Sequence, residues 1–466
     1  MKKTVVIKGT LVVFTMLTLQ SCFVAKDYER PELDIEENYR TDAIVQDTVT
    51  MADVSWRELF TDPVLTDYID LGLTNNIDIR VAIQQIIAAE AYVKQGKAGF
   101  LPTLSGNLRY THQELSNNSQ FAAFSAGSQD QYEVTGNVSW EADIWGKIRS
   151  NSRSFQASYL QTVAAHQAVK TRLISNISST YFSLLALDEQ IEVTEKTILN
   201  RESSLETTKA LKEAGNVTEV GVKQTEAQLY TAQAILLDLK TQSRLLENTM
   251  AILLGEMPME IQRSSLENQS IETDLATGVP MQLLSNRPDV IAAEFKLRSA
   301  FEMTNVARSS FYPSLTLSAN GGLQSLEFDK LFNANSLFAS LVGGLTQPIF
   351  NSRKIKTQHE VALAQQEQAR LSFKQSILNA SKEVSDAMYS YQNAIDKIEI
   401  KQKEFDAYDL ATSYSDELLK NGLANYLEVL SSRENALNSR LDLINAKNNK
   451  LQSIVDLYTA LGGGWK

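Results

Sequence analysis

Cysteine and histidine carry the widest range of protein chemistry, and this 466-residue chain contains one cysteine and three histidines. His112, His166 and His359 are far apart in the sequence and have no spacing typical of a metal site. The chain has no G-x-S-x-G sequence, no P-loop and no paired Cys/His cluster, and its nine methionines form no stripe. We therefore expect no catalytic residue, no metal site and no cofactor, and hence a protein that is not an enzyme.

The single cysteine, Cys22, closes a segment typical of a bacterial lipoprotein signal. Three lysines begin this segment, and its apolar run at residues 9–19 is too short to span a bilayer. The run ends in Leu-Gln-Ser-Cys, which resembles a lipobox. We predict that residues 1–21 are removed and that Cys22 is acylated, because several acyl chains at ~0.8 kcal/mol per buried methylene give a stable anchor. The alternative is an inert, buried cysteine.

The mature chain is acidic. Loss of the three lysines of the signal segment lowers the count of basic residues from 44 to 41, against 56 acidic residues, which gives a net charge of −15. A chain of this charge does not bind nucleic acid by releasing counterions. No later stretch reaches 18 apolar residues, so we expect no transmembrane helix.

Helix-breaking residues are scarce, with only eight prolines and 20 glycines. No proline falls within 103–257 or 349–466. Because proline breaks helices and glycine loosens them, these regions favour very long helices. They argue against the roughly three globular domains that a chain of this length would ordinarily form.

An internal repeat runs through the chain at an offset of roughly 207–211 residues. The sequence Gly-Phe-Leu-Pro-Thr-Leu at residue 99 recurs as Ser-Phe-Tyr-Pro-Ser-Leu at residue 310. Gly215 recurs as Gly422, and the Leu-Gly pair at 254–255 recurs at 461–462. The glycine spacing is 40 in both halves. The repeat predicts one structural unit used twice.

Four segments alternate between apolar and polar residues, as strands with one apolar and one polar face do. They cover residues 104–112 and 132–144 in the first half, and 315–324 and about 337–349 in the second. Their length suits tilted membrane-spanning strands of ~9–11 residues. The alternative is a soluble β-hairpin that buries its apolar face on a core. Aromatic residues expected at a membrane interface lie at the strand ends: Phe100, Trp140, Trp145, Phe311, Tyr312 and Phe350.

Long helices are predicted to follow each pair of strands. Residues 146–214 contain no helix breaker and predict one helix of about 68 residues, roughly 100 Å long. The matching segment is about 353–421, and its apolar residues recur at steps of three and four, the heptad period of a coiled coil. After each glycine turn, a second helix of about 38 residues returns to the Leu-Gly pair.

Together these features resemble the TolC-like outer-membrane factors, and specifically the NodT-type outer-membrane efflux lipoproteins. The resemblance rests on the lipobox, the Tyr-Glu-Arg-Pro sequence at residues 28–31, two Phe-x-Pro strand starts, the Asp-Ile-Trp-Gly sequence at 143–146 and the duplicated helical hairpins. It implies a mainly helical fold with a transmembrane β-barrel part. In this fold a homotrimer with four strands per chain closes a twelve-stranded outer-membrane barrel, continued by a periplasmic coiled-coil α-barrel tunnel.

The repeat and the resemblance together predict the domain layout. Its parts are a signal peptide (1–21), a lipidated arm (22–70), a first repeat (71–255), an inter-repeat equatorial segment (256–282) and a second repeat (283–466). The β-hairpins are expected at 103–145 and 312–350, and the long helical hairpins at 146–254 and 353–461.

The resemblance implies passive export across the outer membrane, to which Cys22 would add a lipid anchor. The expected partners are two further copies of the chain, a periplasmic membrane-fusion adaptor, an inner-membrane pump of the resistance-nodulation-division type and outer-membrane lipid. Drugs, other toxic compounds or metals are the implied cargo classes, and the sequence does not choose among them. A type I secretion exit duct and a structural coiled-coil lipoprotein are the alternatives.

The resemblance also assigns roles to the turns of the helical hairpins. The residues implied to contact the adaptor are Gly215, Asn216, Val217, Asn421, Gly422 and Leu423. Glu428 matches the acidic position of the family's periplasmic gate, with Asn425 and Ser431 beside it in the sequence. Three copies of Glu428 around one axis would repel each other, which favours opening or a bound cation. The alternative is that Glu428 is an ordinary solvated acid.

Overall fold

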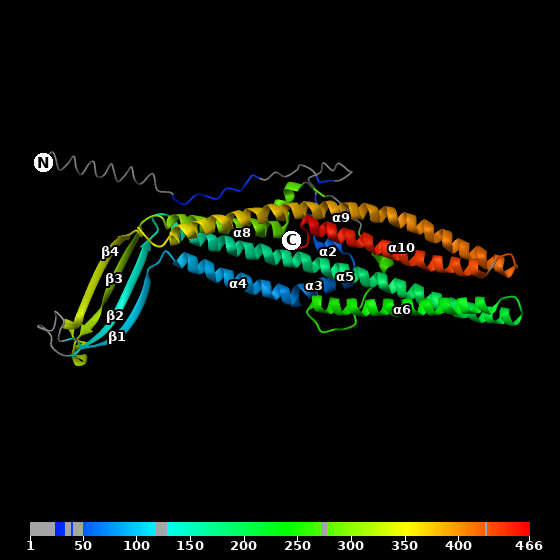
Figure 1. Cartoon of the computed structure of the whole chain (residues 1–466), viewed down its shortest axis with the longest axis horizontal. Helices are drawn as coiled ribbons and strands as arrows, with labels where there is room; N and C mark the ends of the chain where they lie inside the picture. Colours follow the sequence, from blue (N-terminus) through cyan, green and yellow to red (C-terminus); the bar gives the residue numbers. More distant parts are fainter. Residues whose placement is uncertain are drawn as a thin grey trace. The chain divides into compact units, whose positions relative to one another are not determined.

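The computed structural model describes residues 24–32, 39–40, 50–114, 116, 128–269, 271, 277–278, 280–424 and 426–466. The predicted signal peptide, Cys22 and Asn425 lie outside the described residues. Figure 1 gives the labels of the main helices and strands.

Each half of the chain contributes one helix, two strands and two longer helices in the same order. The first half has α4 (Ile77–Ala98), β1 (Thr103–Glu114), β2 (Ser128–Ala142), α5 (Lys147–Glu213) and α6 (Glu219–Leu254). The second half has α8 (Pro288–Ser309), β3 (Ser314–Ser325), β4 (Leu337–Thr346), α9 (Lys354–Lys420) and α10 (Tyr426–Leu461). α5 and α9 have 67 residues each, and α6 and α10 have 36 each. The predicted duplication of a strand hairpin and a long helical hairpin is confirmed.

Shorter helices lie before α4, between α6 and α8, and between β3 and β4. They are η1 (Met51–Asp53), α2 (Trp56–Leu59), α3 (Pro63–Asn75), η2 (Leu266–Asn268), η3 (Pro280–Gln282), α7 (Leu283–Asn286), η4 (Phe328–Lys330) and η5 (Ala334–Ser336). Within the described part of the chain, every helix is too short or too polar to cross a membrane.

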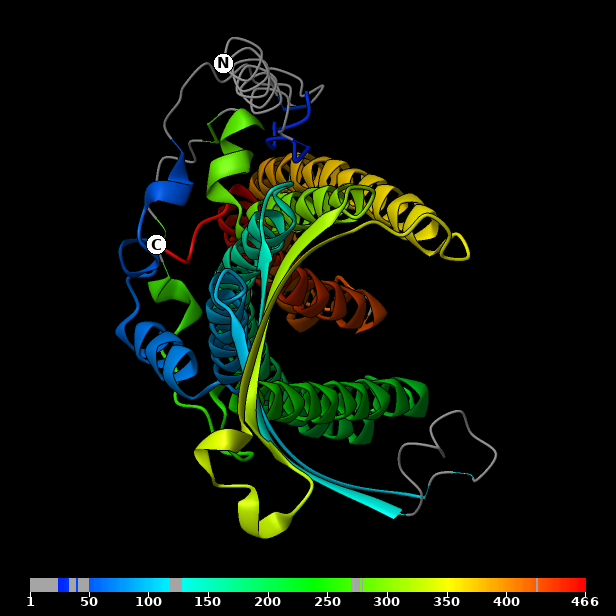
Figure 2. The same ribbon diagram turned by 90° about the vertical axis from the view of Figure 1, so that its left-hand side faces the viewer.

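The four strands form one antiparallel sheet in the order β1-β2-β3-β4, which Figure 2 shows as a single curved layer. The central β2–β3 pairing joins the two repeats, and β1 and β4 are the sheet edges. The predicted end of the fourth strand at residue 349 is wrong, because β4 ends at Thr346. Pro348 follows closely, and proline cannot donate a ladder hydrogen bond.

The chain divides into two compact units, and each unit draws on both repeats. The first holds the sheet and comprises the described parts of Met1–Glu32, Ile86–Gln161 and Ala293–Phe373. The second holds both helical-hairpin turns and comprises the described parts of Leu33–Gln85, Thr162–Ala292 and Lys374–Lys466. The boundaries therefore fall inside α4, α5, α8 and α9.

The core of the second unit is built around aromatic residues from distant parts of the chain. Phe60, Tyr181, Phe182 and Tyr458 are each at most 2% exposed. The rings of Phe60 and Phe182 have centroids 6.2 Å apart, and those of Phe60 and Tyr458 are 6.4 Å apart. Such tilted and edge-on pairs stabilise a core beyond the burial of their surface. They connect the segment before α3 to both α5 and α10.

A buried carboxylate fastens the inter-repeat segment to this core. Asp62 is 8% exposed, and it accepts hydrogen bonds from the Tyr181 hydroxyl (2.9 Å), the Gln269 amide (2.7 Å), the backbone of Val64 (2.9 Å) and the Ser264 hydroxyl. Burial raises the pKa of Asp62, but these hydrogen bonds together outweigh burial, and the net pKa shift is downward. Burial also raises the pKa of Tyr181, to about 12.

Four glycines end the paired helices by the same geometry. Gly215, Gly255, Gly422 and Gly462 have φ of +79°, +75°, +70° and +94°. After each one, the next residue donates its backbone N–H to a carbonyl five positions earlier, as Asn216 does to Leu211 at 2.9 Å. This is the Schellman motif, in which the left-handed residue is usually glycine. The equal glycine spacing in the two halves therefore reports two copies of one helical hairpin.

Candidate channel-forming sheet and helical tip

The sheet has one apolar and one polar face, set by the pairing register. The row Leu108–Val134–Leu323–Leu337 crosses all four strands on one face. The row Ser105–Asn137–Asn320–Ser340 crosses them on the other. Successive strand residues alternate between faces, so this register places the apolar row and the polar row on opposite faces of all four strands. The predicted alternation is therefore coherent across the whole sheet.

The apolar face is not buried on a core within the described part of this chain. Leu104, Leu108, Leu341 and Leu345 are between 66% and 83% exposed. Exposed apolar surface of this extent marks contact with a membrane or another chain. This finding contradicts the alternative of a soluble hairpin that buries its apolar face.

The six interface aromatics all lie at the helix-side end of the strands, before β1 and β3 or near the ends of β2 and β4. The Trp140 indole donates to the Phe100 carbonyl at 2.9 Å, and the Trp145 indole donates to the Pro313 carbonyl at 2.7 Å. Trp145 also stacks on Tyr312, with 5.0 Å between ring centroids. Phe311 and Phe350 are 44% and 88% exposed. Their role at a membrane interface stays a prediction.

The segment that follows Cys22 in the sequence runs antiparallel to α8. The Asn305 side chain exchanges hydrogen bonds with the backbone of Lys26 at 3.2 and 2.9 Å. Further along, the Tyr28 ring meets Phe301 edge-on at 5.6 Å. Arg30 then donates two hydrogen bonds to Glu294, at 2.7 and 2.6 Å. These contacts explain the Tyr-x-Arg part of the Tyr-Glu-Arg-Pro sequence: it docks this segment on α8.

The two helical-hairpin turns lie at the same end of the second unit (Figure 1). Of the residues predicted to contact an adaptor, Gly215, Asn216, Asn421, Gly422 and Leu423 are exposed, and Val217 is half-buried. Across the first turn, Lys212 and Glu219 form an ion pair at 2.5 Å.

A tyrosine that sequence reasoning missed joins the two hairpins at this end. The Tyr426 hydroxyl, at the start of α10, lies 2.7 Å from the hydroxyls of both Thr208 on α5 and Thr225 on α6. Its ring also packs near Gly221, where an added Cβ would lie 3.7 Å from the tyrosine Cδ1. The position of Tyr426, four residues after the Gly422 turn, was the available sequence signal.

A layer of polar residues, further along the helices from the turns than Tyr426, connects all four long helices. Arg433 on α10 donates to Asp416 on α9 at 2.8 Å and to Ser204 on α5. Arg201 on α5 is 4% exposed, and it donates to the backbone carbonyl of Gln228 on α6. Burial lowers the pKa of Arg201, and Glu434 partly counteracts this effect.

Two of the predicted gate residues, Glu428 and Ser431, lie on α10. Glu428 and Ser431 are exposed on α10, and the Glu428 carboxylate has no hydrogen bond or ion pair to another described residue. Asn425 lies outside the described residues. The structure thus brings Tyr426, rather than Glu428, into contact with the other hairpin.

Among the described residues, no cluster of three or more His, Cys, Asp or Glu side chains is arranged to hold a metal ion.

Two segments of the chain, residues 68–256 and 279–463, match the sequence family described as "Outer membrane efflux protein". The chain belongs to the outer membrane efflux protein family. The two matched segments correspond to the two repeats, which explains why the match is interrupted near residue 270. Membership confirms the predicted outer-membrane efflux function and location, and it favours the efflux protein over a structural coiled-coil lipoprotein.

Relatives of this efflux protein span nearly its whole length. It is 27% identical over 461 residues to the cation efflux system protein CusC of Escherichia coli O6:H1, with 97% of each chain covered. It is 29% identical over 463 residues to the solvent efflux pump outer membrane protein SrpC of Pseudomonas putida, with 98% of each chain covered. These relatives are efflux proteins rather than enzymes.

Solved structures confirm the fold of the efflux protein. A crystal structure of CusC superimposes with a TM-score of 0.84 at 26% identity, covering 95% of this chain and 100% of that one. The open MtrE outer membrane channel of Neisseria gonorrhoeae gives a TM-score of 0.85 at 24% identity, covering 96% and 99%.

Proposed function

We propose that three copies of this efflux protein close one channel through the outer membrane. The observation that carries the proposal is the sheet of the described residues, which has β1 and β4 as its edge strands and an exposed apolar face. Four strands cannot close a pore, and an unpaired edge invites pairing with another chain. Pairing of β1 of one copy with β4 of the next would satisfy both edges and direct the leucine rows toward lipid.

The polar rows of serine, threonine and asparagine would then line the lumen. Such a lumen conducts small molecules passively, and the energy for export comes from an inner-membrane pump. The chain acts as a conduit and catalyses no reaction. Relatives of nearly equal identity are named for cation efflux and for solvent efflux, so similarity does not select one cargo.

The helical-hairpin turns around Gly215 and Gly422 are the proposed contact with a periplasmic adaptor, which would connect the channel to a pump of the resistance-nodulation-division type. The turn residues are exposed, and the Schellman geometry gives both turns the same backbone shape. The equatorial belt would consist of the segments around 23–70 and 256–282 and the last few residues.

Acylation of Cys22 is the proposed anchor. Residues 24–32, which follow Cys22 in the sequence, dock on α8, whose last residue lies shortly before β3. Metabolic labelling with palmitate tests this anchor. The native chain should incorporate label and Cys22→Ser should not, whereas label retained by the variant would overturn the assignment.

Reconstitution into planar lipid bilayers tests the channel itself. The purified protein should give discrete single-channel conductance steps of uniform size. Membranes that receive protein but show no steps, although the protein is inserted and folded, would contradict the proposal.

A further inference from the structure

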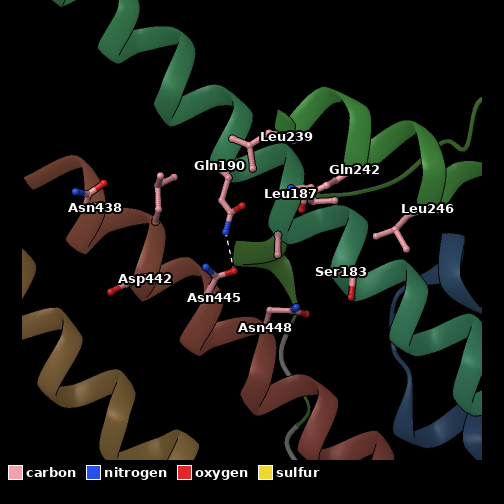
Figure 3. Close-up of a pocket in the computed structure, with 12 residues that line it drawn as sticks. Ser183, Leu187, Gln190, Leu239, Gln242, Leu246, Asn438, Asp442, Asn445 and Asn448 are labelled. Atoms are coloured by element: carbon pink, nitrogen blue, oxygen red, sulfur yellow. Dashed lines mark hydrogen bonds between the residues drawn. The ribbon is translucent and has the colours of Figure 1, made fainter. Parts of the chain in front are cut away.

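A pocket of about 520 Å³ opens between α5, α6 and α10 in the second compact unit (Figure 3). Its volume lies within the range of small-molecule binding sites, roughly 300–1,000 Å³. Its lining residues include none of the proposed gate or adaptor residues.

Carboxamides dominate the polar part of the pocket lining. They are Gln190, Gln242, Asn438, Asn445 and Asn448, and Ser183 adds a hydroxyl. Each carboxamide both donates and accepts hydrogen bonds without carrying charge. Leucines on the same walls, among them Leu187, Leu239 and Leu246, offer apolar surface beside these amides. The lining therefore complements a ligand with both polar and apolar parts.

Four of the five amides form two groups, a paired floor (Gln190 and Asn445) and an unpaired rim (Gln242 and Asn438), and Asn448 accepts from Gln452 at 3.4 Å. Gln190 is 5% exposed, and its amide donates to the Asn445 side chain at 2.8 Å, which connects α5 to α10. Gln242 on α6 and Asn438 on α10 are exposed, and their side chains have no hydrogen bond to another described residue. The rim amides are therefore available to a ligand, while the floor is already oriented.

The pocket lining offers no unpaired charge that would attract an ion. Asp442 is the one ionisable side chain among its lining residues, and its carboxylate already accepts from Lys401 at 2.8 Å. An ion that entered the pocket would lose hydration without meeting an unengaged opposite charge, which is costly. An uncharged ligand does not face this cost.

We infer that this pocket binds an uncharged small molecule that combines hydroxyl or amide groups with an apolar part. That such a ligand is transported cargo rests on the proposed function. Binding of the ligand to the pocket does not depend on that function.

Saturation-transfer difference NMR on the full-length protein in phosphatidylcholine nanodiscs tests the inference. The probes are phenyl β-D-glucoside, which is uncharged, and benzoate and benzyltrimethylammonium, which carry opposite charges on a similar ring. Empty nanodiscs give the lipid background. We expect saturable binding of the glucoside and at least about tenfold weaker binding of both ions.

The double variant Gln242→Ala/Asn438→Ala removes the rim amides without touching the core. It should weaken glucoside binding at least about fivefold, because one uncharged hydrogen bond contributes on that order. The control Asn449→Ala changes an exposed amide on α10 that does not line the pocket, and it should bind as the native chain does. No saturable glucoside binding, equal binding of the ions or an unaffected double variant would each overturn the inference. Single-channel conductance of the same preparations reports separately on the proposed function.

Discussion

Asn76 and Arg287 occupy equivalent places in the two repeats, and each holds the end of a returning helix. The Asn76 amide donates to the Leu253 carbonyl at 2.9 Å, and the Arg287 guanidinium donates to the Ala460 carbonyl at 2.9 Å. Each acceptor belongs to the second-last residue of its helix, α6 or α10. The duplication thus extends from sequence motifs to single hydrogen bonds, although the two donors are different residue types.

Gly255 follows α6 at this junction, and Gly215, in the open turn between α5 and α6, serves as its comparison. A Cβ on Gly255 would lie 2.6 Å from the Asn75 carbonyl oxygen, whereas a Cβ on Gly215 would meet nothing within 4 Å. Both have positive φ, so Gly215→Ala should cost about 1–2 kcal/mol from backbone strain alone. Gly255→Ala should cost roughly 1–3 kcal/mol more, because the backbone must also shift. Thermal unfolding of the solubilised variants measures the difference, and equal losses would show that the junction is loose.

Asp62 should make stability depend on acid pH. Its pKa is lowered in the folded chain, so its contribution is full above the unfolded value of about 3.9 and disappears as pH falls through the folded pKa. Asp62→Asn should therefore be less stable than the native chain at neutral pH, by about 1–3 kcal/mol, and the gap should shrink below about pH 4. Denaturant unfolding from pH 7 to 3 measures this gap, with the exposed Asp67→Asn as control. A gap that stays constant over this range would contradict the assignment.

Tyr426 should stabilise the helical tip through its hydroxyl. Tyr426→Phe keeps the ring but removes the group between Thr208 and Thr225, so local opening at the tip should increase about fivefold, as expected for one hydrogen bond of ~1 kcal/mol. Hydrogen exchange of the peptides around residues 208–228 measures this opening. Tyr230→Phe is the matched control, because that tyrosine is 59% exposed and lies outside the contact between hairpins. Equal exchange in the two variants would show that the Tyr426 hydroxyl does not stabilise the helical tip.

Glu428 should attract cations to the proposed gate. Glu428→Ala should weaken block of single-channel conductance by divalent cations roughly fivefold, since a unit charge at ~4 Å in water contributes about 1 kcal/mol. Glu213→Ala, an exposed acid at the end of α5, is the control and should leave block unchanged. If conductance and block are the same in Glu428→Ala and the native chain, Glu428 is an ordinary solvated acid.

Local sequence signals predicted the regular elements well. Alternation specifies strands, and the absence of proline with a heptad pattern specifies α5 and α9, because these signals depend only on neighbouring residues. The glycines could be found from their spacing, since a left-handed helix end leaves few other residue choices.

Contacts between distant segments could not be predicted in the same way. The carboxylate network of Asp62 joins residues up to 207 positions apart, and the Tyr426 contact spans 218. No local period records such pairings, and the same holds for the β2–β3 pairing between repeats. The pocket likewise depends on three helices whose amides resemble ordinary solvated residues when the sequence is read alone.

Cross-linking between sheet edges tests the central claim most directly. Because Cys22 is proposed to be acylated, cysteines placed in pairs on β1 (Leu104, Gly106 or Leu108) and β4 (Leu341) would be the only free thiols. Oxidation in intact outer membranes should give covalent dimers and trimers for at least one pair, whereas each single-cysteine variant should not form trimers. A folded, membrane-inserted protein that stays monomeric for every pair would contradict a channel closed between copies.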